Sequence, residues 1–170
     1  MIRRLLSRAR AQDGFGLVEL TLAMLVLTVA LFALVASFSA GAIALQRASS
    51  VSTATALGNS QLELFRSKTW DTIELNADAV AVSDSTYKTE AIWSSQITDN
   101  ACSTSDNACV PTRTAVAADG KTYRIDTYVT WLTPSGGGRD VKRVLVVVRD
   151  PAKLASPLVR QASTFERATG

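Results

Sequence analysis

Residues 20–46 read LTLAMLVLTVALFALVASFSAGAIALQ, a stretch of 27 residues without a charged side chain. As an α-helix rising 1.5 Å per residue it would extend about 40 Å, more than the roughly 30 Å hydrocarbon core of a bilayer. The stretch is therefore a candidate membrane-spanning helix, and the rest of the chain is interpreted around it.

The N-terminal segment that precedes this stretch, MIRRLLSRARAQDG, is strongly basic. Its charged residues are Arg3, Arg4, Arg8, Arg10 and one acid, Asp13. Such an excess of arginine keeps this end of a spanning helix in the cytoplasm. The sequence therefore predicts a single-pass cytoplasmic (inner) membrane protein whose C-terminal part is extracytoplasmic. The formal net charge of +3 comes from this segment alone, because 18 basic and 15 acidic residues in total leave equal numbers beyond Gly14.

Glu19 lies at the head of the apolar stretch, where an ionisable side chain needs an explanation. A carboxylate costs about 2.5 to 3.5 kcal/mol at the centre of a spanning helix and less near the interface. Glu19 therefore either marks the polar edge of the span or has a function that requires a cationic partner.

Gly14, Phe15 and Glu19, between a short basic leader and a long apolar helix, resemble the processing motif of type IV prepilins. In that family a membrane-embedded peptidase cleaves after the glycine and methylates the amine of the phenylalanine. The resemblance implies cleavage between Gly14 and Phe15, N-methylation of Phe15, and Glu19 as the fifth residue of the mature chain. Cleavage after Gly16 would make Glu19 the third residue, so the first register is the one that fits.

The same resemblance implies a role for Glu19 in assembly. Once Phe15 is freed, its amine is a buried cation that needs an anion, and Glu19 of a neighbouring subunit supplies one. Because an unpaired buried charge is strongly penalised, the pair selects an axial register more than it adds stability. The implied partners are the prepilin peptidase, other pilin subunits and, before assembly, the membrane; the mature protein is expected on a pilus or at the cell surface.

Two further features bear on which kind of pilin this is. Type IV pilins commonly carry a helix-distorting proline at the position of Ala36, whereas the first proline here is Pro111. Residues 56–73 resemble the helix end of PilV-type minor pilins. The expected function is therefore a structural subunit, a minor pilin of a type IV pilus or related filament. A pseudopilin of a type II secretion or competence system is the alternative within the family.

Outside the family, the N-terminal region also has the basic start of an ordinary secretory signal peptide, with an Ala-x-Ala-like site at residues 40–42. The protein would then be a secreted binding domain. The apolar stretch is longer than the 7 to 15 residues usual for a signal peptide, and Glu19 is not expected at its start.

Helical periodicity continues beyond the span, with apolar or small residues recurring at steps of three or four. The residues of this stripe are Ala44, Ala48, Val51, Thr55, Gly58, Leu62 and Phe65. The opposite face is polar and is expected to meet solvent or neighbouring subunits; it comprises Ser49, Ser50, Ser52, Thr53, Asn59, Gln61, Glu63 and Arg66. The second half of the helix is therefore amphipathic and needs a partner for its stripe.

After Lys68 the sequence alternates with a period of two, which is typical of strands. Residues 121–132 place Tyr123, Ile125, Thr127, Val129 and Trp131 on one face, expected to lie against the helix, and Asp119-Gly120 provides the preceding turn. Residues 133–138 form a glycine-rich loop, and residues 140–150 are apolar on both faces, as in a central strand. Residues 87–93 and 158–165 are weaker strand candidates.

These elements predict an α+β architecture, the type IV pilin fold, in which a long N-terminal helix packs on an antiparallel β-sheet of about four strands. The expected organisation is a leader peptide (1–14), a transmembrane and assembly helix (15–46), an amphipathic helix half (47–68) and an extracytoplasmic β-rich domain (69–170).

Cys102 and Cys109 flank a polar loop and are expected to form a disulfide outside the cytoplasm. Two free thiols are the alternative, and two cysteines without any histidine do not make a zinc site. Asp99, Asn100, Asp106 and Asn107 offer oxygen atoms to calcium but lack the EF-hand spacing. No metal site or cofactor is therefore expected.

The sequence gives little support for catalysis, since it has no histidine, no phosphate loop and no dinucleotide fingerprint. We expect no enzyme activity; an unrecognised hydrolase is the alternative.

Six basic residues gather in the last third of the chain: Arg113, Arg124, Arg139, Lys142, Arg143 and Arg149. Because acidic residues alternate with them, nucleic acid is a weaker partner hypothesis than a solvated sheet face.

Overall fold

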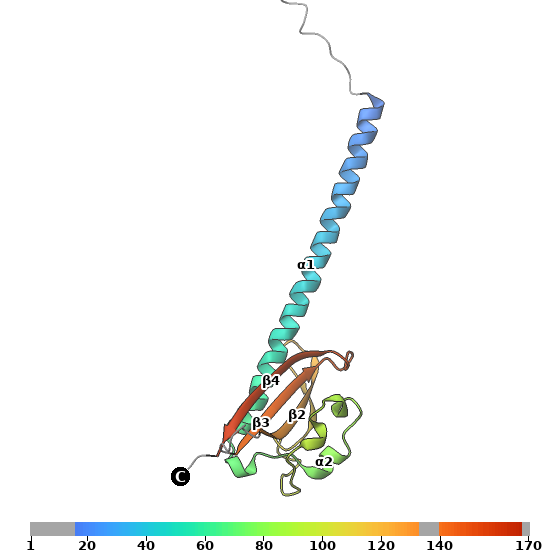
Figure 1. Ribbon diagram of the computed structural model, residues 1–170. Coiled ribbons are helices and arrows are strands. Elements are labelled where there is room, and N and C mark those ends of the chain that lie inside the picture. Colours follow the sequence, from blue (N-terminus) through green and yellow to red (C-terminus); the bar gives the residue numbers. More distant parts are fainter. Residues whose placement is uncertain (1–15, 133–139, 168–170) are drawn as a thin grey trace, which may run out of the picture. The chain divides into compact units, whose positions relative to one another are not determined.

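The computed structural model describes residues 16–132 and 140–167 of the chain. The architecture is α+β, with one long apolar helix, α1 (Leu17–Arg66), and a four-stranded antiparallel sheet (Figure 1). The strands are β1 (Thr112–Val116), β2 (Thr122–Leu132), β3 (Val141–Arg149) and β4 (Pro157–Glu166), which follow one another in the order β1-β2-β3-β4. The predicted fold class, that of a pilin-like protein, is confirmed.

The chain divides into two compact units, residues 1–46 and residues 47–170. In the first unit, residues 17–46 are helical and exposed, and they are long and apolar enough to cross a membrane. The second unit contains the rest of α1, the sheet and the segment between them, and it has its own hydrophobic core.

One face of the sheet, here called the helix face, packs against residues 47–66 of α1. Ala54, Leu62 and Phe65 of α1 lie in one core with Ile125 of β2 and Val146 of β3. The predicted stripe is confirmed over its C-terminal part, since Gly58, Leu62 and Phe65 are buried, whereas Ala44 and Ala48 at its start are exposed. The sheet stabilises the amphipathic half of the helix by covering its apolar stripe, because such a face is stable only when another element buries it.

Two residues depart from the predicted pattern on this face. Gln61 was assigned to solvent but is fully buried, because its amide finds partners in Asn107 and Arg113. Trp131 was assigned to the helix-facing row of β2, yet it lies at the strand's end and keeps 51% of its surface exposed. Of the same row, Tyr123, Ile125 and Val129 are core residues as predicted.

The opposite face of the sheet, here called the second face, is covered around Tyr87 and Ile92 by part of the segment between α1 and β1. This segment contains η1 (Trp70–Thr72), α2 (Ala77–Ala81), η2 (Tyr87–Thr89) and η3 (Trp93–Ser95). Tyr87 stacks on Tyr128 with ring centroids 4.3 Å apart, and both join Leu145 and Val147 in a second apolar cluster. Because both faces are covered, β3 is apolar on both, as predicted for a central strand.

The prediction of a strand at residues 87–93 is wrong, since this stretch contains the short turn η2 and the start of η3. Asp84 Oδ1 accepts a hydrogen bond from Tyr87 N at 2.9 Å, and Tyr87 OH donates to Thr127 O at 2.7 Å. These bonds hold Tyr87 in a turn that packs on the sheet, so its backbone does not pair with a neighbouring strand. The fourth strand is β1, a five-residue edge strand that sequence reasoning missed.

The β1–β2 turn was predicted correctly: Gly120 has a φ of 73°, which favours glycine. The glycine-rich loop expected at 133–138 lies outside the described residues.

The two ends of β4 (Pro157–Glu166) differ. Trp70 Nε1 donates to Phe165 O at 3.1 Å, which attaches the segment after α1 to one end of the strand. At the other end Pro157 has no N–H, and the pairing with β3 shifts register between Val148 and Arg149. Proline and register irregularities are the usual means by which proteins protect an edge strand.

Candidate functional site

The first candidate site is the N-terminal part of α1. Glu19 lies in the first turn, where its N–H and that of Leu20 donate to Gly16 O at 2.9 and 3.1 Å. A carboxylate in the first turn complements the helix dipole. The other predicted residues of this site, Gly14, Phe15 and the four leader arginines, lie outside the described residues.

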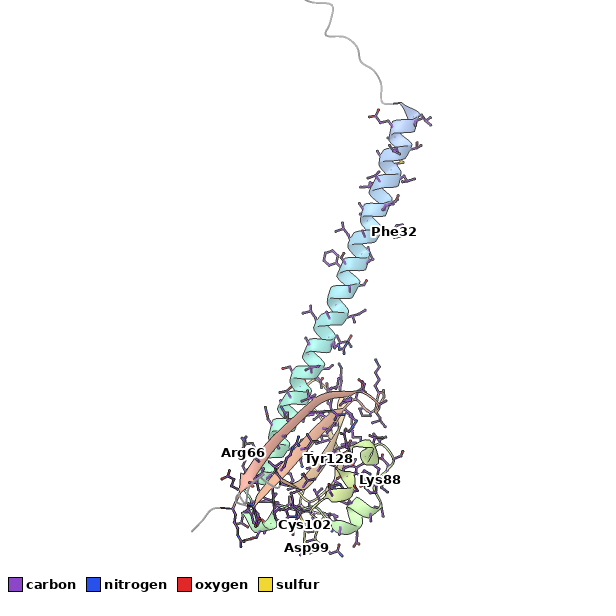
Figure 2. The ribbon with its side chains drawn as sticks, in the orientation of Figure 1. Phe32, Arg66, Lys88, Asp99, Cys102 and Tyr128 are labelled. Carbon is purple, nitrogen blue, oxygen red and sulfur yellow. A yellow bond between two sulfur atoms is a disulfide. The ribbon has the colours of Figure 1, made fainter. Side chains whose placement is uncertain are left out.

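The apolar segment of α1 exposes its side chains around the whole helix, as Figure 2 shows at Phe32. Three of its hydroxyl groups bond to the helix backbone: Thr21 Oγ1 donates to Val18 O, Thr28 Oγ1 to Met24 O, and Ser37 Oγ to Ala33 O, each at 2.9 Å. Hydroxyls bonded to their own backbone need no water, which suits a helix surrounded by lipid or by other helices.

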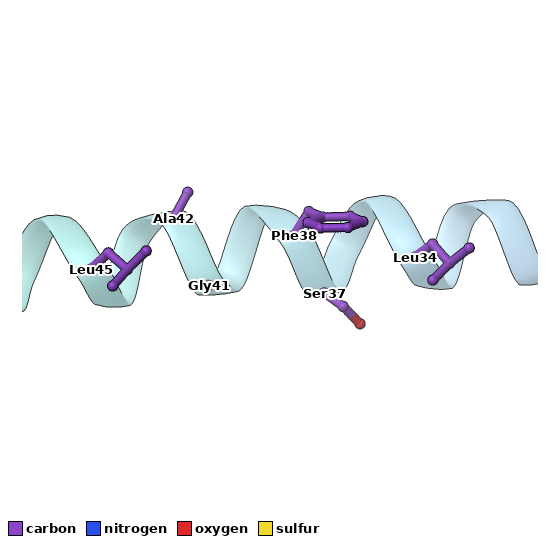
Figure 3. Close-up of a pocket in the computed structure, with 6 residues that line it drawn as sticks. All are labelled: Leu34, Ser37, Phe38, Gly41, Ala42 and Leu45. Atoms are coloured by element: carbon purple, nitrogen blue, oxygen red, sulfur yellow. The ribbon is translucent and has the colours of Figure 1, made fainter.

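Small residues share a face of this helix with Glu19. Ser37 follows Glu19 by eighteen positions, which is five helical turns, so the two residues lie on the same face. Ala33, Ser37 and Gly41 recur every fourth residue along it. Gly41 leaves a shallow hollow between Phe38 and Leu45 (Figure 3), where an added Cβ would meet nothing within 4 Å.

The second candidate site is a network of charged side chains between the second face of the sheet and its covering segment. Asp126 lies at its centre, fully buried, and accepts hydrogen bonds from Arg124 Nε at 2.9 Å and Arg149 Nη1 at 2.5 Å. Glu90 accepts from Arg149 Nη2 and from Arg160 Nη1, both at 2.8 Å. The network therefore joins β2, β3 and β4 to the segment that covers them.

Asp84 completes the network at the surface. Arg124 donates to both of its carboxylate oxygens, at 2.5 and 2.7 Å, a bidentate geometry that fits a guanidinium. This pairing lowers the pKa of Asp84 to about 2 and raises the pKa of Arg124. All of these groups are held by partners of opposite charge, so the arrangement has the chemistry of a structural clamp.

Cys102 and Cys109 form a disulfide with Cα atoms 5.5 Å apart (Figure 2). The predicted pairing is thus present, and both sulfur atoms belong to buried residues. The loop that they close is fastened to its surroundings: Asn76 Nδ2 donates to Cys102 O at 2.9 Å, and Lys68 Nζ lies 2.7 Å from Asp106 Oδ2. The Lys68 ammonium lowers the pKa of Asp106.

The oxygen atoms proposed for calcium have other partners. Asp106 pairs with Lys68 and accepts from Ala108 N, while Asp99 Oδ1 accepts from Ala101 N at 2.8 Å. Asn107 O accepts from Gln61 Nε2. In the part of the chain that the structure describes, no three acidic, cysteine or histidine side chains come together as metal ligands.

The six basic residues considered for nucleic acid do not form one surface. Arg124 and Arg149 are buried in the ionic network. Lys142 is also buried; its Nζ donates to Trp70 O at 2.9 Å and Ile73 O at 3.0 Å and lies 4.5 Å from the Trp70 ring centroid, and burial lowers its pKa. Half-buried Arg113 and Arg143 lie on opposite faces of the sheet, and Arg139 lies outside the described residues.

The chain matches no protein-family model, no curated protein and no solved structure. The residues of this chain and their geometry are therefore the basis for assigning a function.

Proposed function

We propose that the protein is a structural subunit, a minor pilin, of a type IV pilus or a related filament. Prepilin peptidase cleaves it between Gly14 and Phe15, and the new N-terminus at Phe15 is methylated. The helix that follows then leaves the membrane and packs with the helices of other subunits.

The observation that carries this proposal is the combination of α1 and Glu19. Residues 17–46 form a helix that is apolar on all sides and carries one acidic side chain, in its first turn. A helix of this kind is stable in lipid or in a bundle of similar helices, and an acidic group there marks a functional site by default.

The face that Glu19 shares with Ala33, Ser37 and Gly41 supports packing between helices. Small residues let helix backbones approach closely in an apolar environment, where dispersion and polar contacts drive association. Glu19 on that face is well located to meet a cation that an adjacent helix brings, such as the amine of a cleaved Phe15.

The processing step is tested by mass spectrometry of the N-terminus of the mature protein. We expect the mature chain to begin with methylated Phe15. An intact leader, or a new N-terminus near Ala42 as after signal-peptide cleavage, would overturn the proposal.

The assembly step is tested by the Glu19→Ala variant. We expect the variant to be cleaved but to enter filaments at least about tenfold less than wild type, because the buried amine then lacks its anion. Thr21→Val is the matched control in the next half-turn, since the Thr21 hydroxyl only bonds back to Val18 O. Filament content is measured in sheared pili, and equal incorporation of Glu19→Ala would refute the role of Glu19.

Deletion phenotypes in piliation, twitching, secretion and DNA uptake distinguish a pilus from a secretion or competence filament.

A further inference from the structure

Arg113 lies on β1, on the face of the sheet that α1 covers. Its Nε donates a hydrogen bond to Gln61 Oε1 over 2.8 Å. The side chain is half-buried, and this burial lowers its pKa. Within residues 16–132 and 140–167, no carboxylate lies within 4.0 Å of its guanidinium, and its two Nη groups make no hydrogen bond.

The orientation of this guanidinium is fixed by Gln61. Gln61 Nε2 donates to Asn107 O at 3.0 Å, so its Oε1 is the atom that remains for Arg113. Asn107 in turn belongs to the loop closed by the Cys102–Cys109 disulfide. The disulfide therefore holds the loop, the loop orients the buried amide of Gln61, and the amide positions Arg113.

This arrangement differs from that of three other arginines on the sheet. Arg124, Arg149 and Arg160 each have a carboxylate within 2.9 Å. Arg113 has only a neutral amide beside its partly buried guanidinium. Its two Nη groups are left for water or for an anion, and an anion there would offset the hydration that burial removes.

We propose that Arg113 binds a carboxylate side chain that a neighbouring subunit presents in the assembled filament. The inference rests on the proposed function, and it assigns one contact point of the globular domain. With Nε occupied by Gln61, the two Nη groups offer the parallel donors that suit a carboxylate. The oriented side chain loses little freedom on binding, so the contact selects a partner that places an acid beside β1.

The test is Arg113→Gln in the full-length chain. The Nε2 of glutamine is attached to Cδ, as is the Nε of arginine, so the variant keeps a donor for Gln61 Oε1 and removes only the charged end. Two quantities are measured: the melting temperature of the detergent-solubilised chain, followed by tryptophan fluorescence, and the amount of the chain in sheared filaments relative to wild type.

We expect the melting temperature to stay the same or rise, because a desolvated charge has been removed, while incorporation falls on the order of tenfold. A lower melting temperature would show that Arg113 stabilises its own domain and would overturn the inference. Unchanged incorporation would overturn it as well.

Arg143→Gln is the matched control. Arg143 also lacks a carboxylate partner among the described residues, but it lies on the second face of the sheet, and no side-chain amide orients it there. We expect its incorporation to equal that of wild type, and a loss equal to that of Arg113→Gln would show a general need for surface charge instead. If wild type itself is absent from filaments, the proposed function fails; if only the difference between Arg113→Gln and wild type is absent, this inference alone fails.

Discussion

Asp126 accepts hydrogen bonds from Thr112 Oγ1 at 2.8 Å and from two arginines, Arg124 and Arg149. It is fully buried, so its charge is neutralised by these partners and not by water. The carboxylate thereby connects three strands of the sheet through one side chain.

Replacing Asp126 with asparagine keeps the shape of the side chain but leaves buried arginines short of an anion. We expect the free energy of unfolding to fall by about 3 kcal/mol or more. Urea unfolding of the detergent-solubilised chain measures it, with tryptophan fluorescence as the signal. Glu63→Gln is the control, because the exposed Glu63–Arg66 pair should contribute less than about 1 kcal/mol. Equal effects of the two variants would contradict a structural role for the network.

Gly58 of α1 lies against the side chain of Gln161 in β4. A Cβ at Gly58 would collide with Gln161 Oε1, a buried atom without a hydrogen-bond partner in the described part of the chain. Glycine itself costs a helix interior about 1 kcal/mol relative to alanine. The glycine is therefore explained by the approach of β4 to α1.

From this contact we expect the effect of Gly58→Ala to depend on the residue at position 161. In wild type it should leave stability nearly unchanged, because moving the flexible end of Gln161, whose Nε2 donates to Thr55 O at 3.4 Å, offsets the gain in helix propensity. Combined with Gln161→Ala it should stabilise by about 1 kcal/mol, since the collision is gone. A double-mutant cycle by urea unfolding measures the difference, and additive effects would show that the two residues do not interact.

At the scale of elements, the segment between α1 and β1 depends on charge for its attachment to the sheet. Asp84 binds Arg124 from this segment, and its folded pKa of about 2 lies below the ordinary value of 3.8. A carboxyl whose pKa is depressed in the folded state stabilises that state above the unfolded pKa. This contribution is lost as the pH falls through the folded pKa.

We therefore expect wild type to lose stability relative to Asp84→Asn as the pH is lowered from about 4 to 2. The Asp84 side chain is 53% exposed, so solvent screening limits the difference to about 1 kcal/mol or less. Thermal unfolding of both chains at a series of pH values measures it. A constant difference over this range would mean that the Asp84–Arg124 pair does not support the segment.

The disulfide loop is the other element with a measurable contribution. Closing a loop with a separation of seven residues should contribute about 2.5 kcal/mol through the reduced entropy of the unfolded chain. We expect the Cys102→Ala/Cys109→Ala variant to lose about that amount in urea unfolding. Ser105→Ala, in the same exposed loop, should change stability by less than about 0.5 kcal/mol.

The elements differ in how far the sequence could predict them. The apolar run and its continuation at steps of three and four were sufficient for α1. The alternation was sufficient for β2, and the short apolar run was sufficient for β3. Residues 87–93 also alternate, but Tyr87 uses that pattern to pack on the sheet from a turn. The five residues of β1 were too few for periodicity to identify.

The candidate sites were predictable to a different extent. Glu19 and the pair Cys102 and Cys109 could be identified as candidate site residues from the residues that surround them in the sequence. The network around Asp126 could not, because Arg149 and Glu90 lie far from Asp126 in the sequence, and Glu90 reaches Arg149 only when the covering segment closes over the sheet. A partial signal was present in β2, where Arg124 and Asp126 are opposite charges two positions apart and therefore lie on the same face of the strand.

At the scale of the whole molecule, the two compact units have different chemistry. The first exposes a continuous apolar helix, whereas the second buries its apolar residues in two clusters and pairs most of its buried charges. All three tryptophans, Trp70, Trp93 and Trp131, belong to the second unit, so their fluorescence reports on the folded domain and not on the helix in detergent.

The end of β4 near Pro157 has a consequence for how copies of this protein meet. Because Pro157 lacks an N–H and the pairing with β3 shifts register between Val148 and Arg149, a strand that approached this end would find one donor fewer and an irregular ladder. Extension of the sheet from one molecule to the next is therefore disfavoured at this end of the strand, and contacts there are left to side chains.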